Sequence, residues 1–255
     1  MKCLILAAGY ATRLYPLTEN FPKPLLDVGG KPILDWLIED LDATGRIERY
    51  FVVTNHKFTP IFEKWVSARH SRIDRESTPI TVVDDGTSSN ETRLGAVRDI
   101  QFAIEQCGID DDLLVMAGDN LLSFGLKSFI DYFDAKGTTC IMRYYEEDGA
   151  RLLKSGIVEV DSSDRILSME EKPAAPRSNW ACPPFYIYRR CDLPLVARGI
   201  EDGCATDAPG SFIAWLCKQT PVHAWQMSGR RFDIGTIASY EEVKRIFDFT
   251  YSHEE

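Results

Sequence analysis

Two cations follow an apolar strand and a loop of small residues near the start of the chain. The strand is expected near residues 2–7, the small residues Ala7, Ala8, Gly9 and Ala11 follow, and Arg13 and then Lys23 come after them. Small side chains let backbone N–H groups approach an anionic ligand closely, and the two cations can hold its oxygens. The spacing matches neither a P-loop, which needs Gly-Lys-Ser/Thr, nor the G-x-G-x-x-G dinucleotide fingerprint. We predict a triphosphate site here, against the simpler alternative of a strand and an ordinary turn.

Two aspartates occupy positions that suit a metal ion. Asp119 follows an expected strand at 112–117, and Asp233 lies just before the last expected helix, which begins near Thr236. Mg²⁺ in nucleotide sites needs only one or two carboxylates, together with phosphate oxygens and waters. We predict that Asp119 and Asp233 converge on one Mg²⁺. The alternative is that Asp119 forms a turn or helix cap, while Thr236 caps the last helix and Asp233 is an exposed turn residue.

A charged tetrapeptide, Glu170-Glu171-Lys172-Pro173, ends another expected strand. Lysine is a suitable point charge for a phosphate, and a carboxylate suits the hydroxyls of a polyhydroxy ring. These properties favour Lys172 and Glu171 as ligands of a phosphorylated acceptor. An exposed charged turn held by Pro173 is the alternative.

The elements that position these residues alternate between strand and helix through residue 143. Such alternation predicts parallel strands with right-handed crossovers, and the loops 8–18, 84–92 and 118–123 then gather at the carboxyl ends of the strands. After residue 150 the pieces are shorter, at 157–160, 166–169 and 182–188, and we expect a smaller β-rich lobe there. The expected fold is therefore α/β, with a Rossmann-like, mostly parallel mixed sheet.

Composition narrows the class of function. The 255 residues carry a formal net charge of −10, which argues against nucleic acid and anionic membrane as partners. No apolar run approaches the roughly 20 residues that span a bilayer, so we expect a cytoplasmic protein. The seven cysteines include no C-x-x-C pair and the four histidines are scattered, which indicates neither a disulfide framework nor a zinc site.

Taken together and in this order, the four motifs resemble those of the sugar-nucleotide pyrophosphorylases, the nucleotidyltransferases that include glucose-1-phosphate thymidylyltransferase. The resemblance runs from Leu4 to the helix after Asp233. It implies one domain over 1–255, with a nucleotide-binding half at about 1–145 and a sugar-phosphate-binding half at about 146–255. It also implies the reaction of a nucleoside triphosphate with a sugar 1-phosphate to give an NDP-sugar and pyrophosphate, most simply dTTP or UTP with a hexose 1-phosphate, and it leaves a homo-oligomer open.

The resemblance also implies roles for single residues. Arg13 would hold the outgoing pyrophosphate and Lys23 would polarise the α-phosphate, with Asp119 and Asp233 on Mg²⁺. The nucleotide would be bound by Leu6, Ala8, Gly9, Ala11, Thr12, Arg13, Arg93 and Gly95, and the sugar phosphate by Gly156, Glu171, Lys172 and Cys182.

Departures from the thymidylyltransferase pattern leave alternatives open. Ala11 replaces a glycine, which is tolerable if the position needs no positive φ. Arg93 either contacts the base or opens the next helix. A CTP-dependent phosphocholine cytidylyltransferase is one competing activity, with an aromatic box drawn from Trp180, Tyr186 and Tyr188. A non-catalytic nucleotide- or sugar-sensing module is another.

Overall fold

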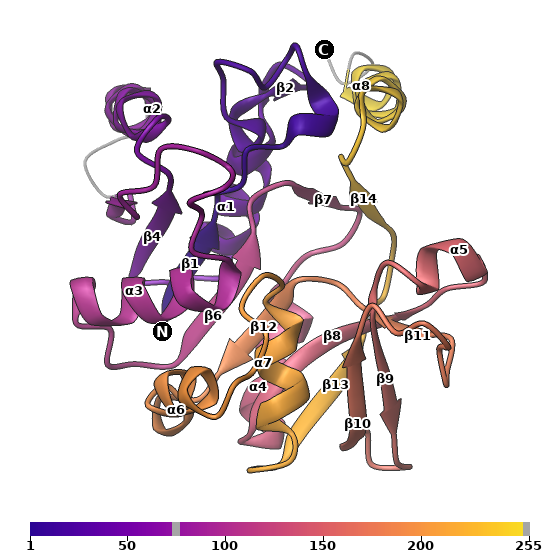
Figure 1. Cartoon of the computed structure of the whole chain (residues 1–255). Coiled ribbons are helices and arrows are strands. Elements are labelled where there is room, and N and C mark those ends of the chain that lie inside the picture. The colour runs from indigo at the N-terminus through magenta and orange to yellow at the C-terminus, as the bar shows by residue number, and fades with distance from the viewer. Residues whose placement is uncertain (73–76, 252–255) are drawn as a thin grey trace. The chain divides into compact units, whose positions relative to one another are not determined.

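The computed structural model describes residues 1–72 and 77–251 (Figure 1). The chain divides into two compact units. Unit 1 comprises residues 1–4, 94–116 and 127–228, and unit 2 comprises residues 5–93, 117–126 and 229–255. Each unit draws on segments that are distant in the sequence. The division into a nucleotide-binding half at about 1–145 and a sugar-phosphate-binding half at about 146–255 stays a prediction.

Unit 2 contains a parallel βα arrangement. Strands β4 (Arg49–Thr54) and β5 (Ile80–Asp84) pair in parallel, from Tyr50 opposite Ile80 to Thr54 opposite Asp84. The end of β1 (Lys2–Leu6) runs beside β4, since the N–H of Ala7 donates to the carbonyl of Val53 at 2.9 Å. Helices α1 (Ile33–Ala43) and α2 (Thr59–Arg72) are the crossover elements, as the alternating sequence pattern predicts.

Short elements complete unit 2. They are the 3₁₀ turns η1 (Thr12–Leu14) and η2 (Lys23–Leu25), the hairpin of β2 (Asp27–Val28) and β3 (Lys31–Pro32), and the antiparallel ribbon of β7 (Asn120–Leu122) and β14 (Arg231–Asp233). Figure 1 shows this ribbon leading into α8 (Ile237–Tyr251). Leu14, Leu121, Ile234 and Tyr240 pack in one apolar cluster, which ties η1, the ribbon and α8 together.

Unit 1 is built on a mixed sheet. The strands lie in the order β10 (Ile166–Glu171), β9 (Gly156–Val160), β11 (Trp180–Cys182), β8 (Thr139–Tyr145), β12 (Phe185–Tyr188) and β6 (Leu113–Ala117), and β13 (Val222–Gln226) pairs in parallel with β8. Its helices are α3 (Ala96–Cys107), α4 (Lys127–Lys136), α5 (Gly149–Leu152), α6 (Leu195–Glu201) and α7 (Gly210–Leu216), with the 3₁₀ turn η3 (Arg190–Asp192).

One expected strand divides into two with different places in the sheet. The segment 182–188 breaks at Pro183-Pro184, so that β11 joins the small antiparallel group with β9 and β10, whereas β12 lies antiparallel between β6 and β8. The side chains of β12 are all buried, as befits a strand covered on both faces. The smaller β-rich lobe is therefore β9–β11 without β12.

No helix in the described ranges, 1–72 and 77–251, is long and apolar enough to cross a membrane.

Candidate active site

Unit 2 contains a pocket of about 180 Å³ at the loop that follows β1. Its lining includes Leu6, Gly9, Ala11, Arg13 and Lys23, all expected to touch a nucleotide. A Cβ added at Gly9 would meet no atom within 4 Å, so the backbone there faces open space that a ligand can enter. The geometry is that of a backbone cradle with two cations at its wall. Ala8, Thr12 and Arg93 are not among the lining residues.

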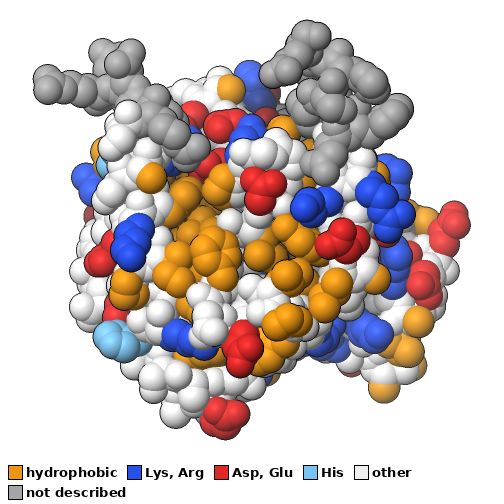
Figure 2. Space-filling model, turned by 90° about the horizontal axis from the view of Figure 1, so that it is seen from above, with side chains coloured by type: hydrophobic (Ala, Val, Ile, Leu, Met, Phe, Trp, Pro, Cys, Tyr) orange, Lys and Arg blue, Asp and Glu red, His pale blue; other side chains and the backbone are white. Residues whose placement is uncertain are grey.

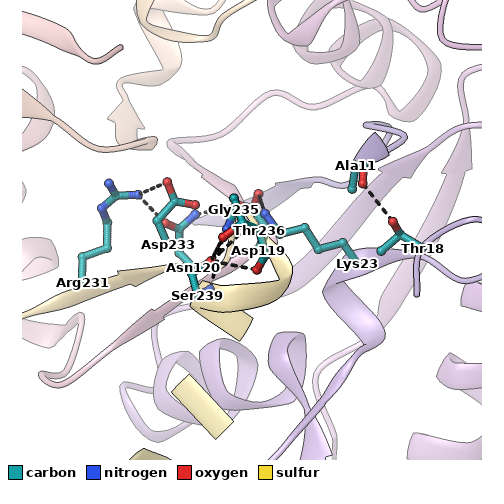
Figure 3. Close-up of polar contacts among 10 residues, drawn as sticks. All are labelled: Ala11, Thr18, Lys23, Asp119, Asn120, Arg231, Asp233, Gly235, Thr236 and Ser239. Atoms are coloured by element: carbon teal, nitrogen blue, oxygen red, sulfur yellow. Dashed lines mark hydrogen bonds and ion pairs between the residues drawn. The ribbon is translucent and has the colours of Figure 1, made fainter. Parts of the chain in front are cut away.

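Ala11 adopts the left-handed backbone conformation, with φ +46° and ψ +42°. We expected alanine to be tolerated at this position if the backbone needed no positive φ, and this condition is not met. The loop is held in this shape because the Ala11 carbonyl accepts two hydrogen bonds, both at 2.9 Å. One comes from the Leu14 N–H, and the other comes from the Thr18 hydroxyl (Figure 3). Thr18 is buried, and its role depends on a contact seven residues away that the sequence does not reveal.

We expect Ala11→Gly to raise the free energy of unfolding by about 0.5 to 1 kcal/mol. The left-handed conformation costs an alanine about 1–2 kcal/mol, and the greater freedom of glycine in the unfolded chain offsets part of the gain. Urea unfolding measures the change. The matched control is Ala8→Gly, at a neighbouring residue without positive φ, which should be destabilising. Equal destabilisation by both substitutions would show that the strain at Ala11 is absent.

Lys23 and Asp119 form an ion pair in the wall of the pocket. The Nζ of Lys23 lies 2.6 Å from Oδ2 of Asp119, and Lys23 is only 8% exposed. Gly118 allows this approach, because a Cβ there would lie 3.0 Å from the Ile5 side chain and 3.3 Å from Pro24. The structure therefore brings together a predicted catalytic cation and a predicted metal ligand.

The β7–β14 ribbon extends this pair into a longer polar network. The Asn120 side-chain amide donates to Oδ1 of Asp119 at 2.7 Å, and its oxygen accepts from Nη1 of Arg231 at 2.7 Å (Figure 3). The same Arg231 nitrogen lies 3.6 Å from Oδ2 of Asp233. Asn120 and Arg231 were not singled out from the sequence, because only the register of the ribbon, with Asp233 opposite Asn120, reveals their contacts.

The donor set fits Mg²⁺. Asp119 immediately precedes the residue that pairs with Asp233, so the two carboxylates lie at the same end of the ribbon. Among the residues that the structure describes, no group of three or more His, Cys, Asp or Glu side chains could hold a metal. Two carboxylates with the remaining ligands from phosphate and water are the donors that Mg²⁺ accepts.

Thr236 also acts as a helix cap. Its hydroxyl accepts from the Ser239 N–H at 3.2 Å, and the Ser239 hydroxyl accepts from the N–H groups of Gly235 and Thr236, each at 3.0 Å (Figure 3). The cap fixes the chain just after Asp233. Thr236 can therefore cap the helix while Asp233 serves as the predicted metal ligand.

Three large exposed apolar side chains occur in the segment between the two pocket cations. Tyr15, Leu17 and Phe21 lie between Arg13 and Lys23 and are 38–41% exposed. Figure 2 shows apolar side chains gathered on the surface, with charged side chains around them.

The loop expected to read the base is held by its own side chains. Arg93 donates to Oδ1 of Asn90 at 2.8 Å and is exposed. Helix α3 begins at Ala96 with Gly95 as its N-cap, so Arg93 does not open the helix. The Asp85 carboxylate accepts two hydrogen bonds from Thr87 at 2.7 Å, and burial raises the pKa of Asp85. A base contact by Arg93 remains a prediction.

Gly95 has a structural reason to be glycine. Its φ is +89°, and a Cβ would lie 2.6 Å from the Thr206 carbonyl oxygen. The next two N–H groups, of Ala96 and Val97, donate to the carbonyls of Asp207 and Thr206 at 3.2 and 3.0 Å. Gly95 thus docks the start of α3 on the backbone of 206–207, and its predicted contact with a nucleotide stays untested.

Unit 1 gathers the residues expected at the sugar phosphate. Gly156 pairs with Glu171 on one side and with Cys182 on the other, and its missing side chain leaves room for Oε2 of Glu171. Burial raises the pKa of Glu171, and neighbouring Lys172 opposes the shift. Lys172 is exposed with φ +49°, and its N–H donates to the Ser155 carbonyl at 3.0 Å. A partly buried carboxylate thus lies next to an exposed cation.

The aromatic residues considered for a quaternary ammonium do not form an open box. Tyr186 and Tyr188 are 2% and 0% exposed and lie in the core of unit 1. The Trp180 ring already carries the Arg143 guanidinium at 4.4 Å from its centroid. Tyr186 and Tyr188 therefore offer a choline headgroup no accessible ring face, and the Arg143 guanidinium already lies over the Trp180 ring.

Residues 2–248 match the model of the nucleotidyl transferase family, to which the chain belongs. The resemblance seen in the sequence is thereby confirmed. The chain is 27% identical to glucose-1-phosphate adenylyltransferase of Fervidobacterium nodosum, over 94% of this chain and 59% of that protein. It is 30% identical to the bifunctional protein GlmU of Methanococcus aeolicus, over 92% of this chain and 51% of that protein. The chain thus spans about three fifths or less of the length of these relatives.

Solved structures confirm the fold class. A UDP-glucose pyrophosphorylase complexed with UDP-glucose superposes with a TM-score of 0.82 at 21% identity, over 98% of both chains. UDP-glucose pyrophosphorylase from Acinetobacter baumanii gives 0.80 at 20% identity, over 99% of this chain and 94% of the other. The α/β fold with a mixed sheet is that of these proteins.

Proposed function

We propose that this chain transfers a nucleotidyl group from a nucleoside triphosphate to a sugar 1-phosphate and releases pyrophosphate. We further propose dTTP or UTP and a hexose 1-phosphate as its substrates, with Mg²⁺ as cofactor. The observation that carries the proposal is the Lys23–Asp119 pair in the wall of a pocket formed by a small-residue loop. Family membership supports the nucleotidyl transfer. The name of the Fervidobacterium nodosum relative, glucose-1-phosphate adenylyltransferase, supports a hexose 1-phosphate, and the pyrophosphorylase complexed with UDP-glucose supports UTP.

The chemistry needs alignment and charge more than a protein base. A phosphate oxygen of the sugar 1-phosphate attacks the α-phosphorus, and the bond from that phosphorus to the β-phosphate oxygen breaks. The nucleophile is already an anion, so no proton has to be removed by a side chain. Catalysis then depends on positioning and on stabilising charge on the phosphates, as in phosphoryl transfer.

Each pocket residue has a part in this scheme. The backbone around Gly9 and Ala11 cradles the triphosphate, Arg13 stabilises the leaving pyrophosphate, and Lys23 polarises the α-phosphate. Asp119 and Asp233 hold Mg²⁺, which neutralises phosphate charge when bound. The cations present charge at fixed places, so little reorganisation accompanies the reaction.

The residues of unit 1 serve the acceptor. Lys172, which is exposed, binds the sugar phosphate as a point charge. Glu171 accepts hydrogen bonds from ring hydroxyls beside Gly156 and Cys182. The raised pKa of Glu171 indicates a poorly solvated carboxyl, for which a hydroxyl donor is a favourable partner.

The test is pyrophosphate release with Mg²⁺ over dTTP, UTP, CTP, GTP and ATP, each against several sugar 1-phosphates and phosphocholine. Turnover with dTTP or UTP and a hexose 1-phosphate is expected. Turnover with CTP and phosphocholine alone would identify a cytidylyltransferase. Nucleotide binding without turnover in any combination would identify a sensing module.

We expect Lys172→Ala to raise the KM for the sugar 1-phosphate by about 10- to 100-fold, as loss of a hydrogen bond to a charged group does. The KM for the nucleotide should change little. Steady-state kinetics with each substrate varied in turn measures both. Lys154→Ala, at another exposed lysine of unit 1, is the control. A change in the KM for the nucleotide alone would show that Lys172 acts on the nucleotide and not on the sugar 1-phosphate, which would contradict this prediction.

A further inference from the structure

Both candidate metal ligands are paired with cations of the chain itself. Asp119 has Lys23 on Oδ2 and the Asn120 amide on Oδ1, so both of its oxygens already accept a hydrogen bond. Asp233 has Arg231 at 3.6 Å from Oδ2. The charges of the two carboxylates and of the two cationic side chains, Lys23 and Arg231, sum to zero. A divalent cation therefore meets no net negative charge from these four side chains.

Arg231 is held in place by the ribbon. It lies two residues before Asp233 on β14, hence on the same face of the strand, and its guanidinium donates to Asn120 across the ribbon. The Arg231 side chain is 16% exposed, which limits how far solvent screens its charge, whereas the side chain of its partner Asp233 is 54% exposed. Nothing in the proposed transfer reaction assigns this arginine a role.

We infer that Arg231 is a positioning residue that, together with Lys23, keeps the Asp119–Asp233 pair charge-compensated and so lowers its affinity for a divalent cation while nucleotide is absent. This inference rests on the proposed function for the identity of the metal ligands. A cation must displace Lys23 from Asp119 or compete with its charge. Triphosphate oxygens in the pocket lined by Lys23 offer that lysine another partner, and they add the negative charge that the two carboxylates lack.

The test is Mn²⁺ binding to the nucleotide-free protein, followed by electron paramagnetic resonance of the unbound ion. Arg231→Gln keeps a hydrogen-bond donor for Asn120 and removes the charge. It should bind Mn²⁺ about tenfold more tightly than the wild type, given the Coulomb energy of charges a few ångströms apart near a surface. Lys23→Met should act in the same direction. The Asp119→Asn/Asp233→Asn protein measures binding elsewhere on this acidic chain.

Matched controls separate position from overall charge. Arg230→Gln changes the adjacent arginine, whose guanidinium lies over the Phe232 ring, and should bind Mn²⁺ as the wild type does. Arg231→Lys should restore wild-type affinity. The gain in Arg231→Gln should vanish when Asp233→Asn is added. Unchanged affinity in Arg231→Gln would overturn the inference whatever Lys23→Met shows, as would an equal gain in Arg230→Gln.

These outcomes are independent of turnover. Pyrophosphate release by the wild type tests the proposed function, and the Mn²⁺ titration contains no substrate. A chain that turns over normally but whose variants bind Mn²⁺ as the wild type does would keep its function and lose this role for Arg231.

Discussion

Asp119→Asn is expected to lower kcat by about 1,000-fold, because losing a carboxylate ligand removes several kcal/mol of metal-assisted charge stabilisation. Asparagine is chosen over alanine since its side-chain oxygen can still accept from the buried Lys23, which would otherwise lose its partner. The substitution therefore tests charge more than packing. Pyrophosphate release at saturating substrates measures the effect, and Asp233→Asn should behave similarly.

Asp131→Asn is the control for both aspartate variants, since Asp131 is an exposed residue that pairs only with Lys127 in the recorded ion pairs of the described chain. It should keep wild-type turnover. Thermal unfolding should show that Asp119→Asn stays folded. A rate within about threefold of the wild type in a folded Asp119→Asn protein, a change of well under 1 kcal/mol in barrier height, would contradict the two-aspartate assignment.

Arg13→Met is expected to lower kcat by about 100- to 1,000-fold, the cost of removing one preorganised group that stabilises transition-state charge. Arg13 is exposed, lines the pocket, and forms no ion pair within residues 1–72 and 77–251, so the fold does not depend on its charge. The melting temperature should therefore stay close to that of the wild type. Single-turnover measurements separate the chemical step from product release.

Arg13→Lys distinguishes charge from geometry. A lysine keeps the positive charge but lacks the planar fork that holds two oxygens, so it should recover only part of the lost rate. Arg198→Met, at an exposed arginine of unit 1 paired with Asp202, is a neutral comparison. A kcat unchanged in Arg13→Met would remove Arg13 from the transition-state machinery.

Part of the lining of the pocket in unit 2 could be predicted from the sequence because its parts are local, and nucleotide binding there stays a prediction. The strand ending at Leu6, the loop over 7–12 and the cation at 13 are consecutive, so their order fixes much of their geometry. The left-handed conformation of Ala11 could not be predicted in this way. It depends on the hydroxyl of Thr18, a residue with no motif around it.

The polar network beyond Lys23 depends on strand pairing over long sequence separation. Strands β7 and β14 have three residues each, too few for an alternating pattern to stand out. When the register of β7 with β14 is not known, the sequence indicates only a turn residue at Asn120 and a solvated charge at Arg231. The sequence predicted Asp119 and Asp233 as partners but not the side chains between them.

Topology in unit 1 shows the same limit. Gly156, Glu171 and Cys182 were expected at one site, and the register of β9 with β10 and β11 brings them side by side. The placement of β12 between β6 and β8 was not expected. An apolar run in a sequence indicates that a strand is covered on both faces, but it does not indicate which strands lie beside it. Pairing order is a long-range property that periodicity does not encode.

The stoichiometry of products tests the central claim most directly. With the active pair of substrates, phosphorus-31 NMR of the completed reaction should show pyrophosphate and an NDP-sugar formed in equal amounts, with the sugar phosphate consumed in the same amount. That result requires transfer of the nucleotidyl group to the sugar phosphate. Pyrophosphate accompanied by nucleoside monophosphate, with the sugar phosphate left intact, would mean that water is the nucleophile and would contradict the account.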